Sequence, residues 1–480
     1  MNKRLTFHLV GVVVRVVGAL MALPLVVSLI LRSGDTIPIL IAMLVTVAAG
    51  SALALIKPRR DTLRPREGFA IVAFSWIIVS FLGGLPFYFS GYVSSLVDCF
   101  FETVSGFTTT GSTILTDVEA LPRGLLFWRS FTHWGGGMGV LVLSLALIPK
   151  MGARSIHLMR AESPGPSTDK LVPRVASNAK ILYTIYVDLS AIMVVALLLC
   201  GLPLYDAVVH MFGAVGTGGF GVYNTSIAYY DSAAVDVVIG IFMALFGVNF
   251  SLYYYLLTKN WKTALKNSEL QTYLAILLGA SVVIAINILP LYGGRFFTAL
   301  RYSFFQCSSI MTTTGYATAD FDVWPQLSRS LLVMLMVIGA SAGSTGGGIK
   351  VIRLQLLLKS LVRDIRRTVH PKSVNTIKLD GHTVSESILS GVQGFFFAYA
   401  LVLVVATVIV SFDGFSFETN LTAVIATLSN IGPGLGTVGP TGNYAAFSDV
   451  SKLVLSLCML IGRLEIFPIL MLLDPDAWKR

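Results

Sequence analysis

Ten apolar runs divide the 480-residue chain, and they constrain its fold more than any other feature. They lie near 7–31, 37–56, 68–90, 124–148, 180–201, 233–258, 270–291, 327–340, 387–412 and 451–473. Most are as long as the roughly 20 residues that a helix needs to cross a bilayer. None alternates apolar and polar residues as a half-buried strand does. The runs therefore predict an all-α polytopic membrane protein.

The distribution of charge orients the chain. Only 12% of the residues are charged, about half the share of a soluble domain. With Lys3 and Arg4 placed inside, most of the 35 Lys and Arg fall in inner loops, whereas the outer loops are richer in acid. The basic loops are 57–66, 150–180, 259–266 and 350–378. This positive-inside bias predicts a cytoplasmic N-terminus in an inner-type membrane and explains the net charge of +10 without nucleic acid.

Four shorter apolar runs lie among the long ones, near 97–108, 205–215, 297–311 and 418–429. They are too short to cross a bilayer about 30 Å thick and suit re-entrant half-helices. Each leads into a charge-free stretch of small or hydroxyl residues. The four stretches are SGFTTTGST (105–113), GAVGTGGFG (213–221), SIMTTTGYAT (309–318) and TLSNIGPGLG (427–436).

After two leading runs, one unit recurs four times: a long helix, a half-helix, a Gly-rich stretch and a second long helix. This recurrence predicts an N-terminal two-helix domain at 1–62. The four pore repeats then lie at 63–150, 151–260, 261–372 and 373–480. The glycines that close the stretches are Gly111, Gly219, Gly315 and one of Gly432, Gly434 and Gly436.

The four stretches predict a cation site built from backbone. Non-helical backbone at membrane depth is tolerated only where it is buried in protein or lines a watery path, and Gly permits the unusual backbone angles. Four stretches on one axis would form a ring of carbonyl oxygens that replaces a cation's water shell, with the negative ends of the half-helices pointing at it. Without carboxylates, the ring suits a monovalent ion better than a divalent one. The alternative is that small residues only let helices pack closely.

Another small-residue stretch, GASAGSTGGGIK at 339–350, interrupts the second helix of the third repeat. It does not match a phosphate-binding P-loop, because Lys350 is followed by Val351 where that motif has Ser or Thr. We expect a flexible intramembrane loop on the inner side of the third stretch. This loop would obstruct the path and act as a gate.

Two basic features are further candidates. Arg463 lies deep in the last apolar run, where a charge is costly. It could be a positive barrier below the cation site, an ion pair with Glu465, or a hydrogen-bond donor to loop carbonyls. The basic segment 350–378 could contact anionic lipid or a cytosolic partner, or could serve orientation only.

The sequence offers no arrangement for catalysis. Its four Cys and six His show no metal-ligand spacing, and no Ser/His/Asp set or carboxylate pair is present. A membrane enzyme acting on lipid-linked substrates would need such a cluster, so we expect neither an enzyme nor a cofactor. A scaffold that has lost transport is disfavoured by the intact glycines.

The motifs also carry a family resemblance. The four stretches, AGSTGGGIKVIR (342–353) and GRLEIF (462–467) resemble the membrane subunit of bacterial Trk potassium-uptake systems, within the wider Trk/Ktr/HKT superfamily. The likeness covers nearly the whole chain. It implies four helix–pore-loop–helix repeats around one pore in the bacterial inner membrane, with two extra N-terminal helices. It also implies a homodimer and a cytosolic ring of nucleotide-binding RCK-domain regulators.

Carried over by position, the resemblance implies a potassium filter and a gate, and it selects Gly432 as the fourth glycine. The filter residues are Thr109, Thr110, Gly111, Thr217, Gly218, Gly219, Thr313, Thr314, Gly315, Asn430, Ile431 and Gly432. The gate residues are Gly339, Ala342, Gly343, Ser344, Thr345, Gly346, Gly347 and Gly348, braced by Arg463. The extra Gly in the second stretch departs from its neighbours and predicts a looser quadrant with less strict selectivity.

The expected function is K⁺ uptake, with K⁺ as the transported, filter-bound ion. A sodium-permeable transporter, or one coupled to protons or sodium as a symporter, is the alternative within the same superfamily. Relative permeabilities separate these two functions.

Overall fold

The computed structural model describes residues 2–56, 58, 65–139, 175–371 and 375–475. Helices dominate this part of the chain, and its only strands are the antiparallel pair β1 (Lys378–Leu379) and β2 (His382–Thr383). Six of its helices are long and apolar enough to cross a membrane, or seven if one sharply bent pair is counted as a span. The predicted all-α polytopic membrane protein is therefore confirmed. Most of the inner loop expected at 150–180 lies outside the described residues.

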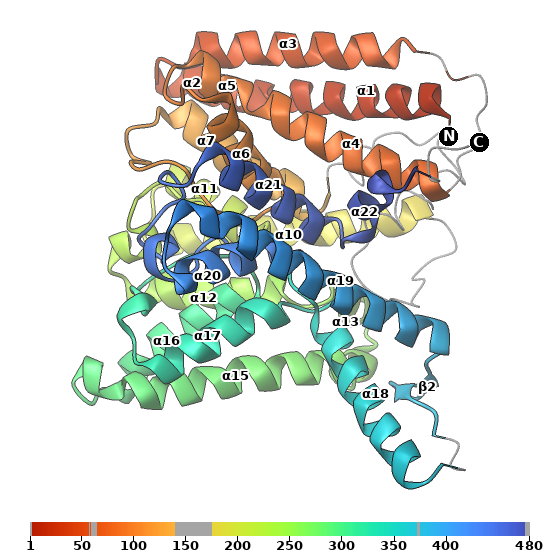
Figure 1. The fold of residues 1–480 in the computed structure, drawn as a ribbon. Helices are drawn as coiled ribbons and strands as arrows, with labels where there is room; N and C mark the ends of the chain where they lie inside the picture. Colours follow the sequence, from red (N-terminus) through yellow and green to blue (C-terminus); the bar gives the residue numbers. More distant parts are fainter. Residues whose placement is uncertain (1, 57, 59–64, 140–174, 372–374, 476–480) are drawn as a thin grey trace.

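The N-terminal helices lie at one edge of the molecule (Figure 1). They are α1 (Lys3–Leu20), α2 (Ala22–Leu31) and α3 (Thr36–Ala54). α1 and α3 pack so closely that a Cβ added to Gly11 or to Gly50 would lie closer than 3.0 Å to backbone atoms of the other helix. Small residues of this kind let membrane helices approach one another. Asp35 accepts a hydrogen bond from the N–H of Leu125 (2.7 Å), which ties this layer to the first repeat.

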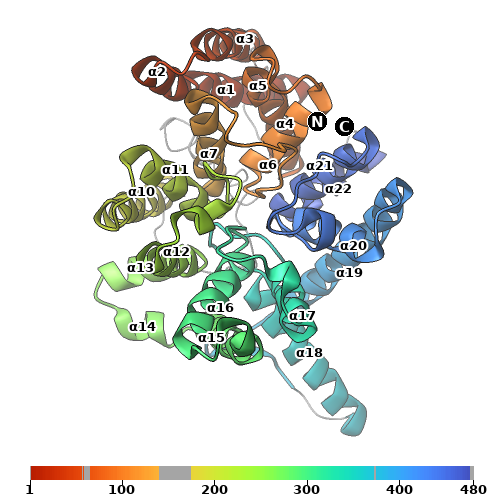
Figure 2. The same ribbon diagram turned by 90° about the vertical axis from the view of Figure 1, so that its left-hand side faces the viewer.

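Four similar units follow, arranged in chain order around one centre (Figure 2). Their first helices are α4 (Pro65–Gly83, followed by α5, Leu85–Phe89), α10 (Val175–Leu199), α15 (Ser268–Ile288) and α19 (Glu386–Val410). Their half-helices are α6 (Leu96–Phe107), α11 (Leu204–Val215), α16 (Phe296–Met311) and α20 (Phe417–Leu428). Their second helices are α7 (Arg123–Gly137), α12 (Ala233–Phe246), α17 (Gln326–Ile338) and α21 (Asp449–Arg463). All four half-helices lie where the short apolar runs predict them.

The second helix of repeat 2 is broken, although the sequence predicts one helix over 233–258. α12 ends at Phe246, and α13 (Phe250–Leu257) continues at an angle of 94°. Asn249 caps α13, since its side chain accepts a hydrogen bond from the N–H of Ser251 (2.9 Å). Hydropathy does not show this break, because the residues on both sides of it are apolar.

The second helix of repeat 4 is broken in the same way, although the sequence predicts one helix over 451–473. α22 (Phe467–Leu473) is separated from α21 where Glu465 and Ile466 adopt φ of 55° and 68°. In repeat 1, the predicted helix over 124–148 ends at Gly137 as α7, and residues 140–148 lie outside the described part of the chain. The second helix therefore stops near its middle in every repeat that the structure describes there.

The remaining elements complete the fold. They are α14 (Trp261–Leu265), α18 (Val351–Val369), η2 (Ser226–Tyr230), η3 (Leu289–Tyr292), η4 (Phe321–Val323), η5 (Ser411–Asp413) and η6 (Gly436–Val438). α18 extends away from the helical body beside the β1–β2 hairpin (Figure 1).

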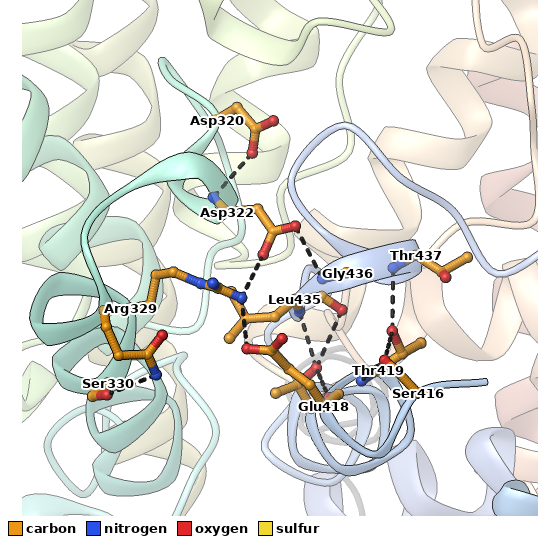
Figure 3. A network of polar contacts seen from close by, with 12 residues as sticks. Asp320, Asp322, Arg329, Ser330, Ser416, Glu418, Thr419, Leu435, Gly436 and Thr437 are labelled. Carbon is orange, nitrogen blue, oxygen red and sulfur yellow. Dashed lines mark hydrogen bonds and ion pairs between the residues drawn. The ribbon is translucent and has the colours of Figure 1, made fainter. Parts of the chain in front are cut away.

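Polar contacts join the loops of neighbouring repeats beyond the Gly-rich stretches. Between repeats 3 and 4, Arg329 pairs with Asp322 (3.2 Å) and with Glu418 (2.6 Å), as Figure 3 shows. Asp322 also accepts a hydrogen bond from the N–H of Gly436 (3.2 Å). This network links η4 and α17 of one repeat to α20 and η6 of the next, so it holds these two quadrants together at their loops.

The close approach of α1 and α3 gives a prediction for stability. Gly50→Val should lower the thermal unfolding midpoint of the purified protein, because the added side chain meets the backbone of Arg15 and forces the helices apart. Overpacking of this kind costs about 1–3 kcal/mol. Gly279→Val is the matched control, since a Cβ on Gly279 in α15 meets nothing within 4 Å. Equal midpoints for the two variants would contradict this packing.

Candidate functional site

The four half-helices end in the same turn. After the last helical residues, Thr109, Thr217, Thr313 and Asn430 adopt φ of 56°, 56°, 60° and 58°. In each repeat the next residue donates its N–H to a carbonyl five residues back at 2.8 Å, as Thr110 does to Ser105. This is the Schellman arrangement that ends many helices, usually with Gly in the left-handed position. A β-branched Thr there is uncommon, so the surrounding structure fixes these three turns.

The stretches then meet in a closed ring. All four glycines, Gly111, Gly219, Gly315 and Gly432, have positive φ, between 78° and 99°. A Cβ on each would lie closer than 3.0 Å to a carbonyl oxygen of the next stretch, in the order Gly111 to Gly218, Gly219 to Thr314, Gly315 to Ile431 and Gly432 to Thr110. The last of these contacts returns to the first repeat. The structure therefore brings the four predicted glycines together around one centre.

The ring also identifies the fourth glycine. Gly432 occupies the place in repeat 4 that Gly315 occupies in repeat 3, two residues after the left-handed Asn430. Gly434 lies farther on and does not have positive φ, and Gly436 begins η6. The geometry thus agrees with the choice of Gly432 over the other two.

Most residues of the stretches are buried, and their side chains support one another. In repeats 1 and 3 the hydroxyls on either side of the left-handed residue are hydrogen-bonded, Thr108 to Thr110 and Thr312 to Thr314, each at 2.8 Å. In repeat 4, the Asn430 amide donates to the Thr110 hydroxyl (2.9 Å) and so joins the last stretch to the first. With no charged side chain in the ring, its electrostatics come from carbonyl dipoles and from the C-terminal ends of the half-helices.

The loop at 339–350 lies against this ring. The N–H of Gly347 donates to the hydroxyl of Thr313 (2.7 Å), and a Cβ on Gly347 would lie closer than 3.0 Å to the carbonyl oxygen of Ser429. Gly339, Gly343 and Gly348 all have positive φ. The predicted intramembrane loop is therefore in contact with the stretches of repeats 3 and 4.

The loop is held by the break in repeat 2. The N–H of Ser341 donates to the carbonyl of Gly247 (3.0 Å), and the N–H of Phe250 donates to the carbonyl of Gly343 (3.0 Å). Both Gly247 and Phe250 lie at the break between α12 and α13, where the helix leaves peptide groups without helical partners. The broken helix and the loop therefore provide hydrogen-bond partners for each other's backbone N–H and carbonyl groups.

Glu269 is a functional candidate that the sequence analysis missed. It is buried at the start of α15, where its carboxylate accepts hydrogen bonds from the N–H groups of Ala342 (2.7 Å) and Ile352 (3.2 Å). Ala342 lies in the loop, and Ile352 lies just after it, in the first turn of α18. The signal in the sequence that could have identified it is a carboxylate in the first turn of a spanning helix.

Arg463 contacts three parts of the site. Its guanidinium donates to the hydroxyl of Thr109 (3.2 Å) and to the carbonyls of Thr345 (2.9 Å) and Gly137 (2.8 Å). It therefore joins the first stretch, the loop and the end of α7. Glu465 forms an ion pair with Arg353 of α18. Among the three interpretations of Arg463, the hydrogen bonds support the donor to loop carbonyls.

The second stretch is not loosely packed, contrary to the expectation from its extra Gly. The space beside Gly218 is filled by the imidazole of His133 from α7, since a Cβ on Gly218 would lie closer than 3.0 Å to three atoms of that imidazole. The sequence could not show this, because His133 and Gly218 are far apart in the chain and belong to different repeats.

Comparison with known proteins agrees with this architecture. A family model, TrkH, described as a cation transport protein, matches residues 37–477. The chain belongs to this family. It is therefore a multi-pass membrane transport protein and not an enzyme.

Individual relatives cover the chain from end to end. The Trk system potassium uptake protein TrkH of Salmonella typhimurium is 39% identical over 485 residues, covering 100% of both chains. The Trk system potassium uptake protein TrkG of Escherichia coli is 32% identical and covers 100% of this chain and 99% of its own length. The crystal structure of the potassium transporter TrkH from Vibrio parahaemolyticus superposes with a TM-score of 0.90, at 34% identity and with 100% of both chains covered.

Removing the Glu269 carboxylate should destabilise the protein. Glu269→Ala leaves the buried N–H groups of Ala342 and Ile352 without their acceptor, at about 1–3 kcal/mol for each unpaired group. Its thermal unfolding midpoint should fall below that of Glu269→Gln, which keeps an acceptor oxygen. If the two variants unfold at the same temperature, Glu269 does not hold the loop through these bonds.

Proposed function

We propose that this chain is a potassium-selective channel or transporter that takes up K⁺ across the bacterial inner membrane, with its N-terminus in the cytoplasm. The observation that carries this proposal is the closed ring of glycines and carbonyls from Gly111 to Gly432. The names of its relatives as potassium uptake proteins support the choice of ion. K⁺ is the transported substrate here, and the chain needs no resident cofactor.

The ring would act as the selectivity filter. Carbonyl oxygens from the four stretches would replace the water shell of a bare alkali ion. The negative ends of α6, α11, α16 and α20 would add an attractive field without a fixed charge. Such a field favours a monovalent cation, because divalent ions are usually held by carboxylates.

The loop at 339–350 would act as the gate below the filter. Its contacts with Thr313 and Ser429 support this role, because they place it against two quadrants of the ring. The glycines with positive φ would let it change conformation. Arg463 would hold the loop closed through the carbonyl of Thr345.

The protein would act as a homodimer regulated by a cytosolic ring of nucleotide-binding RCK-domain subunits. The surface that supports the regulatory partner is α18 (Val351–Val369), which follows the gate loop directly. It exposes the apolar side chains of Leu358, Leu361 and Ile365. Lys359 and Arg366 directly follow two of these residues in the sequence. A docked partner could therefore move the gate through α18.

The ring predicts that Gly315→Ser weakens selection of K⁺ over Na⁺. A Cβ at this position meets the carbonyl oxygen of Ile431, and its φ of +85° is strained for any residue with a side chain. Uptake of K⁺, Rb⁺ and Na⁺ into proteoliposomes measures the change, with Gly279→Ser as the control. Cation flux unchanged by Gly315→Ser would refute the filter, and no cation flux at all in the unaltered protein would refute the proposed function. A sodium-permeable or ion-coupled transporter would appear as comparable Na⁺ uptake or as a dependence on a proton or sodium gradient.

The gate predicts that Arg463→Gln raises K⁺ flux in the absence of a cytosolic partner. The shorter, neutral side chain cannot reach Thr109, Gly137 and Thr345 together, so the loop loses its link to the ring. Flux per molecule in proteoliposomes measures this effect, with Arg463→Lys as a partial replacement that keeps the charge. A fall in flux would instead support a role for Arg463 in the conduction path.

A further inference from the structure

One position of the ring differs between the repeats. Immediately before the ring glycine, three repeats carry a side chain, at Thr110, Thr314 and Ile431, and the second repeat has Gly218. Gly218 does not have positive φ, so its backbone conformation accepts a residue with a Cβ. The absence of a side chain at Gly218 therefore has a cause outside its own backbone.

That cause is the imidazole of His133. The imidazole is fully buried, and a Cβ on Gly218 would lie closer than 3.0 Å to its Nδ1, Cγ and Cε1 atoms. A Cβ on Gly216 would likewise meet the backbone carbonyl of His133. His133 belongs to α7 of repeat 1, so one repeat supplies the group that fills the missing side chain of the next.

His133 is itself held in place from two sides. Its Nδ1 is 2.8 Å from the carbonyl oxygen of Gly106 in the half-helix of repeat 1. Because a carbonyl can only accept, Nδ1 carries the proton and donates in this bond. The imidazole also packs against the aromatic ring of Phe220, with centroids 4.1 Å apart, directly after the ring glycine Gly219.

A second side chain of α7 completes the support behind the second stretch. The guanidinium of Arg129, one turn before His133, lies 3.4 Å from the centroid of the Phe220 aromatic ring, close enough for a cation–π contact. Arg129 also forms a buried ion pair with Glu102 (2.6 Å). The Glu102 carboxylate accepts a hydrogen bond from the N–H of Ile114, two residues beyond the first stretch's Ser112. Phe220 is thereby fixed between two side chains anchored on repeat 1.

We propose that His133 is a positioning residue that determines ion selectivity: its imidazole stands in for the side chain missing at Gly218 and holds that carbonyl in the ring. The carbonyl oxygen of Gly218 is the one that closes the contact with Gly111, so a shift of this backbone opens the ring between repeats 1 and 2. This inference rests on the proposed function of the ring as a cation filter. It adds a determinant of selectivity that lies behind the filter and not in it.

The packing predicts that His133 and Gly218 are complementary. His133→Ala should lower the ratio of K⁺ to Na⁺ uptake by at least about tenfold, because it removes a group larger than the single methylene that changes discrimination on that scale. Gly218→Ala should lower it as well, because its Cβ collides with the imidazole. In the variant that combines both changes, the methyl group added by Gly218→Ala fills part of the space that the imidazole leaves. The ratio should then recover part of the way to that of the unaltered protein and exceed that of either single variant.

Two more substitutions separate the volume of the imidazole from its hydrogen bond. His133→Phe keeps an aromatic ring and loses the donor, but Gly106 still accepts a hydrogen bond from the N–H of Thr109 (3.1 Å). His133→Asn keeps a donor near the place of Nδ1 and loses the outer half of the imidazole. If the imidazole acts by filling the space beside Gly218, His133→Phe should retain selectivity better than His133→Asn. The reverse order would overturn the proposal.

The measurement is uptake of K⁺ and Na⁺ by the full-length protein in proteoliposomes, with the thermal unfolding midpoint of each variant measured in parallel. Unchanged selectivity in His133→Ala, or a double variant as impaired as the two single changes combined, would overturn the proposal. If His133→Ala does not fold, complementary packing still requires a higher unfolding midpoint in the double variant than in Gly218→Ala. If Gly218→Ala does not fold, it requires that the double variant folds. Absence of any flux in the unaltered protein would count against the proposed function, whereas selective flux that ignores His133 would count against this inference alone.

Discussion

The fold depends on the approach of each ring glycine to a carbonyl of the neighbouring repeat. At all four junctions the space between the stretches is too small for a Cβ, so one side chain at Gly111, Gly219, Gly315 or Gly432 would separate two quadrants. Left-handed residues before each glycine turn the chain out of its half-helix and into this contact. The half-helices, their second helices and the loop at 339–350 are arranged to present and support these few backbone groups.

Each quadrant reaches the same backbone conformation with different support. Repeats 1 and 3 use paired Thr hydroxyls, and repeat 4 uses the amide of Asn430. Repeat 2 has neither and is supported by His133 from repeat 1. The ring therefore has approximate fourfold symmetry in its backbone but not in the side chains that support it, so equivalent substitutions in different repeats should have unequal effects.

Local patterns in the sequence predicted the half-helices and the ring glycines, because length, apolar content and Gly placement are readable along the chain. The breaks at Asn249 and Glu465 were not predictable in this way. The loop that hydrogen-bonds to the free peptide groups at the first break is about ninety residues away in the sequence. Glu269 and His133 acquire their roles only from partners in other segments. For Arg463 the sequence left three roles open, and only its contacts with Thr109 and Thr345 separate them.

The proposed function requires an alkali ion to be coordinated by the backbone carbonyls of the ring. Diffraction from crystals of the purified protein grown in Rb⁺ or Tl⁺ tests this directly, because the anomalous signal locates the ion. We expect a peak on the axis between the carbonyls of Thr110, Gly218, Thr314 and Ile431, which is lost when Na⁺ replaces these ions. An anomalous peak at carboxylates elsewhere in the protein with none at the ring, or a structure in which the four glycines lie apart, would contradict the account.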